Sequence, residues 1–121
     1  MSDSSMDKVR SLMRRLQIGT ANNQILWEQQ SDTAYLYARR SSSVWVAADS
    51  DGTAPFKLQV YDGDGQVVDE YETVMRATEA EYRAANQELA ELYKAARRQA
   101  LRSDEVLDDL MQDLPPDPNS W

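Results

Sequence analysis

The sequence contains neither cysteine nor histidine among its 121 residues. Without cysteine, the chain cannot form a disulfide, supply a thiol nucleophile or offer a thiolate ligand to a metal ion. Without histidine, it lacks the imidazole group that most serine triads and many zinc sites use. Because these absences remove the commonest catalytic groups, we expect a protein that is not an enzyme, with no catalytic residue, no metal site and no cofactor.

Long apolar runs are also missing from the sequence. No stretch approaches the roughly 18 apolar residues that indicate a membrane-spanning helix. The first residues lack the basic segment and the apolar run of a signal peptide. We therefore expect a cytoplasmic protein that does not bind membranes.

Acidic side chains outnumber basic ones by 21 to 13, which gives a formal net charge of −8. This surplus opposes direct binding to nucleic acid, because phosphates carry the same sign. The distribution is uneven, since residues 1–22 hold four basic and two acidic side chains. That basic segment is either a solvated helix face or a docking patch for an acidic partner.

Hydrophobic periodicity predicts a helix, then a sheet, then two helices. Apolar residues recur at steps of three and four over 5–22, from Thr78 to Arg102, and again over 104–114. The intervening period of two predicts five strands, placed at 25–27, 33–40, 43–48, 56–61 and 66–72. Short polar turns between them indicate antiparallel pairing. We expect an α+β fold with an N-terminal helix, a five-stranded antiparallel meander and two C-terminal helices packed on one sheet face.

The predicted last helix has an apolar stripe that we expect to face the core. The stripe consists of Val106, Leu107, Leu110, Met111 and Leu114. Pro115 and Pro116 end this helix, because proline cannot continue one. Residues 1–114 are therefore predicted to form a single domain, and residues 115–121 a disordered tail.

The acidic clusters are candidate metal or proton-transfer sites. The run Asp62-Gly63-Asp64-Gly65 resembles the start of a calcium loop, but positions six and twelve are Val67 and Thr73 instead of glycine and glutamate. A hairpin turn is the favoured interpretation. The carboxylates around 69–72 and 104–113 lack a nearby phosphate loop or a converging base, so we interpret them as solvated surface.

The aromatic residues of the predicted sheet supply the candidate binding surface. If the apolar residues of 56–61 face the helices, alternation places Trp45 and Tyr61 on the opposite face. Tyr35 and Tyr37 share a face with each other, and we assign them to the same outer side. Exposed clusters of large aromatic side chains usually mark a partner surface. The predicted partner-binding residues are Tyr35, Tyr37, Trp45 and Tyr61, with a second-layer core as the alternative interpretation.

Three segments carry further motifs, namely Gly19–Trp27, Phe56–Asp62, and Leu92–Leu101 followed by Asp104–Leu110. They resemble the I-x-W strand, the aromatic-x-L-x-V-x-D strand and the L-Y-x-x-A-R-R…D-E-x-L-D-x-L ending of a group of small uncharacterised bacterial proteins. Asn23 stands where that group tends to have glycine, which suits a left-handed residue. The resemblance implies a fold and attaches no function.

These observations favour a small regulatory or adaptor protein that acts through contacts with another protein, and they leave a homodimer open. The alternative is an acidic inhibitor or immunity protein, encoded by a phage or plasmid, that blocks a nucleic-acid-binding enzyme. A carboxylate-based, metal-dependent enzyme is a less favoured alternative. An inhibitor of a basic target would lose affinity steeply with salt, whereas an aromatic binding face would not.

Overall fold

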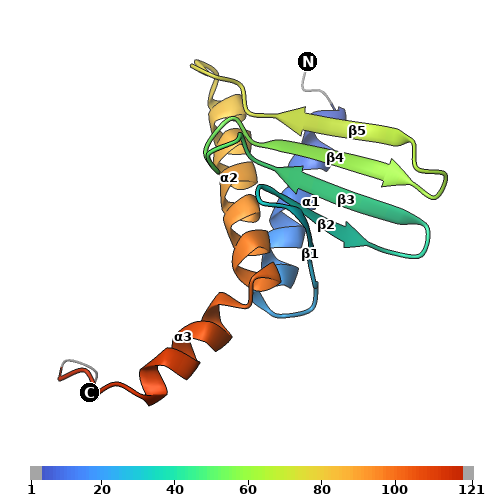
Figure 1. The fold of residues 1–121 in the computed structure, drawn as a ribbon. Coiled ribbons are helices and arrows are strands. Elements are labelled where there is room, and N and C mark those ends of the chain that lie inside the picture. Colours follow the sequence, from blue (N-terminus) through green and yellow to red (C-terminus); the bar gives the residue numbers. More distant parts are fainter. Residues whose placement is uncertain (1–3, 119–121) are drawn as a thin grey trace.

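The computed structural model describes residues 4–118, which form three helices and five strands. The helices are α1 (Ser4–Ala21), α2 (Ala80–Ala100) and α3 (Ser103–Gln112). The strands are β1 (Glu28–Ser31), β2 (Ala34–Ala38), β3 (Ser42–Ala47), β4 (Lys57–Asp62) and β5 (Val67–Glu72). This order confirms the predicted α+β class, with one helix before a five-stranded sheet and two helices after it (Figure 1).

The sheet is an open antiparallel meander, because its strands lie in the order β1-β2-β3-β4-β5 and every neighbouring pair is antiparallel. Its first strand begins three residues later than predicted. The N–H groups of Gln24 and Ile25 both bond to the carbonyl oxygen of Gly19, which folds this segment back on the end of α1. Asn23 precedes that segment with a φ of 60°, the left-handed conformation that its sequence context suggested.

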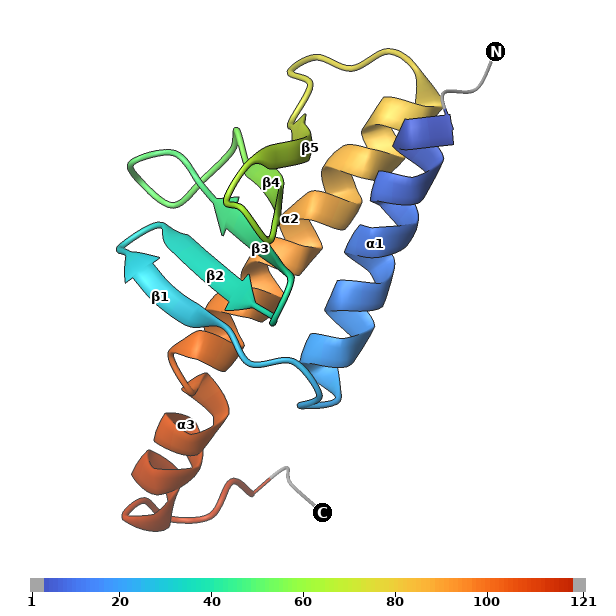
Figure 2. The same cartoon turned by 90° about the vertical axis from the view of Figure 1, so that its right-hand side faces the viewer.

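The core lies between one face of the sheet and a layer formed by α1 and α2, which run side by side (Figures 1 and 2). Met13 of α1 and Leu89 and Leu92 of α2 are fully buried there. The sheet contributes Val46 and Leu58, which are neighbours across the β3–β4 pair. Within residues 4–118, no helix covers the opposite face of the sheet (Figure 2).

The third helix departs from the predicted packing. α3 projects away from the body beyond the end of α2 (Figures 1 and 2), and none of its ten residues is buried. The expectation that both C-terminal helices pack on the sheet is therefore wrong for α3 and right for α2. None of the helices described is long and apolar enough to span a membrane.

The predicted tail, 115–121, lies only partly within the described residues. Residues 115–118 are exposed. Residues 119–121, including Trp121, lie outside the described part of the chain.

Candidate interaction surfaces

The four predicted partner-binding aromatics do not form one surface. Tyr35 is completely buried on the helix side of the sheet, where its ring lies 5.7 Å from that of Tyr93 on α2. Tyr37 also faces the helix layer, with its ring 5.8 Å from that of Trp27. The assignment of Tyr35 and Tyr37 to the outer face is therefore wrong.

Strand register explains this error. Tyr35 lies opposite Val46 on β3, and Tyr37 lies opposite Val44. Directly opposed residues of an antiparallel pair point to the same face. Because both valines face the core, the two tyrosines must face it as well.

Trp45 and Tyr61 lie on the outer face of the sheet, as predicted, and both are half-buried. Trp45 sits in a row across the strands with Leu36 and Gln59. The Tyr61 hydroxyl donates a hydrogen bond to the side-chain carbonyl of Gln59. Two of the four predicted residues, Trp45 and Tyr61, therefore lie on the outer face. Each packs against neighbours on the same face.

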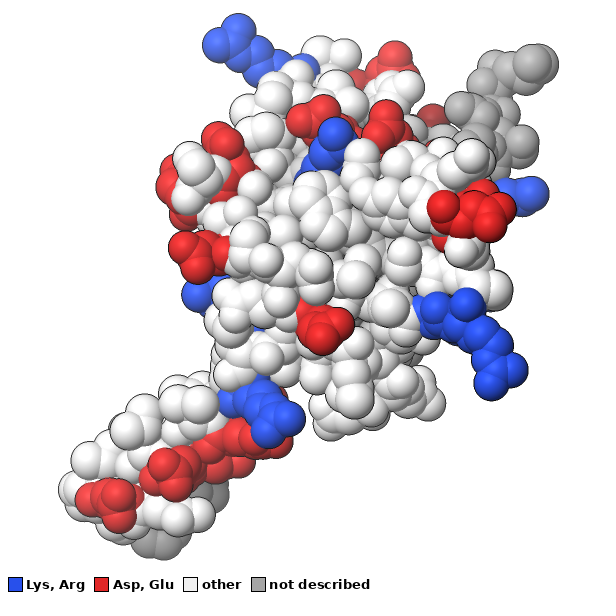
Figure 3. Space-filling view, turned by 45° about the vertical axis from the view of Figure 1, so that its right-hand side comes forward, with Lys and Arg blue, Asp and Glu red and all other residues white. Residues whose placement is uncertain are grey.

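Exposed large apolar side chains gather on α3 instead. Four of its residues and one that follows its last turn expose about half of their area, from 47% to 61%. These side chains, which the sequence predicted to face inward, are Val106, Leu107, Leu110, Met111 and Leu114. In the space-filling view, a line of acidic side chains runs along α3 with uncharged residues beside it (Figure 3).

The direction of α3 is set by the residue just before it. Arg102 precedes the helix with φ 54° and ψ 45°, a left-handed conformation that ends the path of α2. Two ion pairs span the bend, one from Arg98 to Asp104 and one from Arg102 to Glu105. All four side chains are exposed, so these pairs contribute little to stability.

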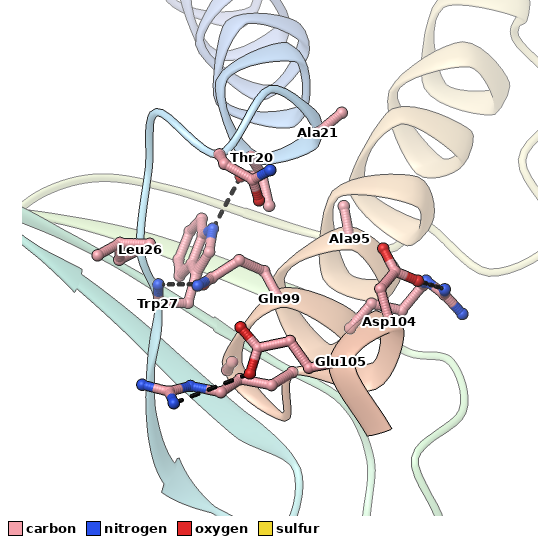
Figure 4. A pocket seen from close by; sticks show the side chains of 12 residues that line it. Thr20, Ala21, Leu26, Trp27, Ala95, Gln99, Asp104 and Glu105 are labelled. Carbon is pink, nitrogen blue, oxygen red and sulfur yellow. Dashed lines mark hydrogen bonds and ion pairs between the residues drawn. The ribbon is translucent and has the colours of Figure 1, made fainter. Parts of the chain in front are cut away.

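A groove of about 870 Å³ lies where the end of α1, the segment before β1 and the α2–α3 bend meet (Figure 4). Trp27 lines it, and its backbone N–H donates to the side chain of Gln99. The indole Nε1 donates to the Thr20 hydroxyl at 2.9 Å, and that hydroxyl donates to the carbonyl of Leu16. The charged residues that line the groove are the ion-paired residues of the bend.

The run from Asp62 to Gly65 forms the turn between β4 and β5. One carboxylate oxygen of Asp62 accepts hydrogen bonds from the N–H groups of Asp64 and Gln66, at 2.9 and 3.0 Å. This arrangement closes the β4–β5 turn, which confirms the hairpin interpretation. Within residues 4–118, no group of three or more acidic side chains is placed to hold a metal ion.

Part of the basic N-terminal segment serves the fold. Arg10 and Arg14 of α1 both pair with Glu88 of α2, at 2.7 and 3.3 Å. These contacts join the two helices of the core layer. The segment is therefore more than a solvated helix face.

Comparisons with protein-family models, with curated proteins and with solved structures found no match to this chain. The function must therefore be argued from the geometry of its surfaces.

Proposed function

We propose that this protein is a non-catalytic protein-binding module and that α3 is the element through which it binds. The observation that carries the proposal is the exposure of an apolar stripe on a helix that has no buried residue. Contiguous exposed apolar patches on a folded protein usually mark an interaction site. An amphipathic helix that lays such a stripe in a partner's groove is a common way for proteins to recognise each other.

The length of α3 supports the same proposal. Isolated helices shorter than about 12–15 residues are marginal in water, and most helix stability in proteins comes from packing an apolar face. α3 has ten residues, and within residues 4–118 none of the side chains on its apolar face is buried. A partner that covers this face would supply the missing packing.

Site-specific photo-crosslinking in the native host tests this function. A photoreactive residue replaces Leu110 on α3 in one variant and Leu26 in a matched control, because Leu26 is a comparably exposed leucine outside α3. We expect covalent adducts with another protein from position 110 and not from position 26. Equal yields from both positions, or no adduct from either, would refute the proposal.

A second pair of variants separates binding from folding. Leu107→Ser with Leu110→Ser should abolish the adduct formed by a photoreactive residue at Met111. The free energy of unfolding should change by no more than about 0.5 kcal/mol, because exposed side chains away from the core contribute little. A large loss of stability would show that α3 belongs to the core of the domain.

The alternative function, an acidic inhibitor of a nucleic-acid-binding enzyme, would use the same helix. α3 and the two residues after it hold five acidic side chains and no basic one, and a basic nucleic-acid-binding surface attracts such a helix. We propose it as the second candidate function. If it holds, the crosslinked partner binds DNA or RNA, and nucleic acid competes with this protein for it; a partner that binds no nucleic acid contradicts it.

A further inference from the structure

The apolar stripe of α3 is bordered by acidic residues along both edges. Successive residues of a helix are rotated by about 100°, so the stripe from Val106 to Leu114 covers an arc of about 140°. Met111 forms one edge of the stripe, and Asp104 and Asp108 lie next to it around the helix. Asp109 and Asp113 lie at the opposite edge, beside Val106. A partner surface that covers this stripe therefore lies beside carboxylates at both edges of the stripe.

Much of this acidic charge is uncompensated. Asp104 pairs with Arg98, and Glu105 pairs with Arg102 across the bend. Asp108, Asp109 and Asp113 make no ion pair within residues 4–118. Two carboxylates at one edge and one at the other are therefore left to pair with a partner.

This charge pattern argues against two other occupants of the stripe. In a second copy of the chain, α3 would bring five acidic residues against five more, and like charges at close range repel. A membrane surface with anionic lipids would repel the same carboxylates, whereas helices that lie on membranes usually have basic polar faces.

The geometry points to a partner of defined chemistry: we infer that α3 docks in an apolar protein groove whose two rims both carry lysine or arginine. This inference rests on the proposed function, because it names the partner class for the same helix. The apolar stripe supplies most of the binding free energy, through burial. The flanking carboxylates fix the orientation of the helix and speed the encounter, since complementary charges act mainly on specificity and association rate.

A designed peptide serves as the probe. It forms an amphipathic helix with leucine on one face and lysine along both flanks, and the control peptide has glutamate in place of lysine. Binding to the full-length protein is measured by fluorescence anisotropy at about 50 mM and about 500 mM salt, where screening differs strongly. We expect the lysine peptide to bind, to weaken at least about tenfold at high salt, and the glutamate peptide not to bind.

Two charge-matched variants locate the contact. The first carries Asp104→Asn, Asp108→Asn, Asp109→Asn and Asp113→Asn. The second removes the same number of charges from the sheet and its hairpin, through Glu28→Gln, Asp64→Asn, Glu70→Gln and Glu72→Gln. We expect at least about a tenfold loss of affinity for the first variant and less than a twofold change for the second.

Several outcomes would overturn the inference. They are equal losses in the two variants, binding of the glutamate peptide, and α3-dependent binding to lipid vesicles of phosphatidylcholine with phosphatidylserine. An α3-dependent dimer at low salt in analytical ultracentrifugation would assign the stripe to a second copy. If crosslinking from position 110 persists while the peptide results fail, the proposed function stands and only the partner chemistry is wrong. If crosslinking fails too, both are wrong.

Discussion

Arg10 of α1 and Glu88 of α2 form the principal ion pair between the two helices of the core layer. The guanidinium Nη2 lies 2.7 Å from Oε1 of the carboxylate, and Nε donates to both carboxylate oxygens at 3.2 and 3.3 Å. The two side chains are only 24% and 17% exposed. The hydrogen bond from Arg10 to Glu88 raises the pKa of the arginine, so the guanidinium stays protonated.

Replacing Glu88 with glutamine should destabilise the protein by about 1–2 kcal/mol. The amide keeps the shape of the side chain but removes the charge that faces Arg10 and Arg14. Urea unfolding followed by circular dichroism measures the change. Glu91→Gln is the matched control on the exposed side of α2, where the carboxylate accepts a hydrogen bond from the Gln87 side-chain amide at 3.2 Å. Equal effects of the two substitutions would contradict a specific α1–α2 bond.

Asn86 joins α2 to the end of the sheet, and its replacement by alanine should cost about 2–3 kcal/mol. Its Oδ1 accepts from the Tyr71 hydroxyl at 2.6 Å and from the Val74 N–H at 3.0 Å, while Nδ2 donates to the Val74 carbonyl at 2.9 Å. Alanine removes all three bonds together. Chemical denaturation of Asn86→Ala beside Gln87→Ala, its exposed neighbour, checks this. A Gln87 variant that loses as much stability would count against the prediction.

Replacing Tyr35 and replacing Trp45 with serine should lower the free energy of unfolding by very different amounts. Tyr35→Ser removes a fully buried ring and leaves a cavity, which should cost about 3–5 kcal/mol. Trp45→Ser acts on a half-buried ring of the outer face, where about 1–2 kcal/mol is expected. The midpoints of urea unfolding measure both. A Trp45 variant that unfolds as early as the Tyr35 variant would show that a layer of core covers the outer face.

The protein should lose stability in strongly alkaline solution through Tyr93. Burial, followed by the neighbouring Tyr35, raises the pKa of the Tyr93 hydroxyl above its ordinary value. A raised folded-state pKa means that the folded protein favours the neutral phenol. The stabilisation is therefore complete below pH of about 10 and is lost as the pH rises through the folded-state pKa. The free energy of unfolding measured between about pH 8 and 11 should fall less steeply in Tyr93→Phe than in the unsubstituted protein. Parallel slopes would refute this.

Most of the fold was predictable from the sequence. Its helices and strands bury apolar residues that recur with the period of a helix or of a strand. β2 was the exception, since Ala34, Leu36 and Ala38 offer an apolar face opposite Tyr35 and Tyr37. Alternation alone cannot decide between two such faces. The decision comes from register, which places the tyrosines beside valines of β3 that belong to the core.

The exposure of α3 could not be predicted for a different reason. An amphipathic pattern shows that a helix has a face to bury, but not whether the same chain or another protein covers it. The deciding feature is the backbone at Arg102, which turns the chain away from the sheet. The acidic residues along both edges of the stripe can be read from the sequence. They are the sequence feature that indicates an exposed helix.

The bend at Arg102 has a consequence for the reach of the molecule. Only Leu101 and Arg102 separate α2 from α3, and Leu101 already has right-handed helical torsions. A left-handed residue other than glycine costs about 1–2 kcal/mol. If Arg102 adopted right-handed torsions, residues 80–112 would form one straight rod about 50 Å long. A single pair of backbone angles therefore decides whether α3 leaves the end of α2 at an angle or continues along its axis.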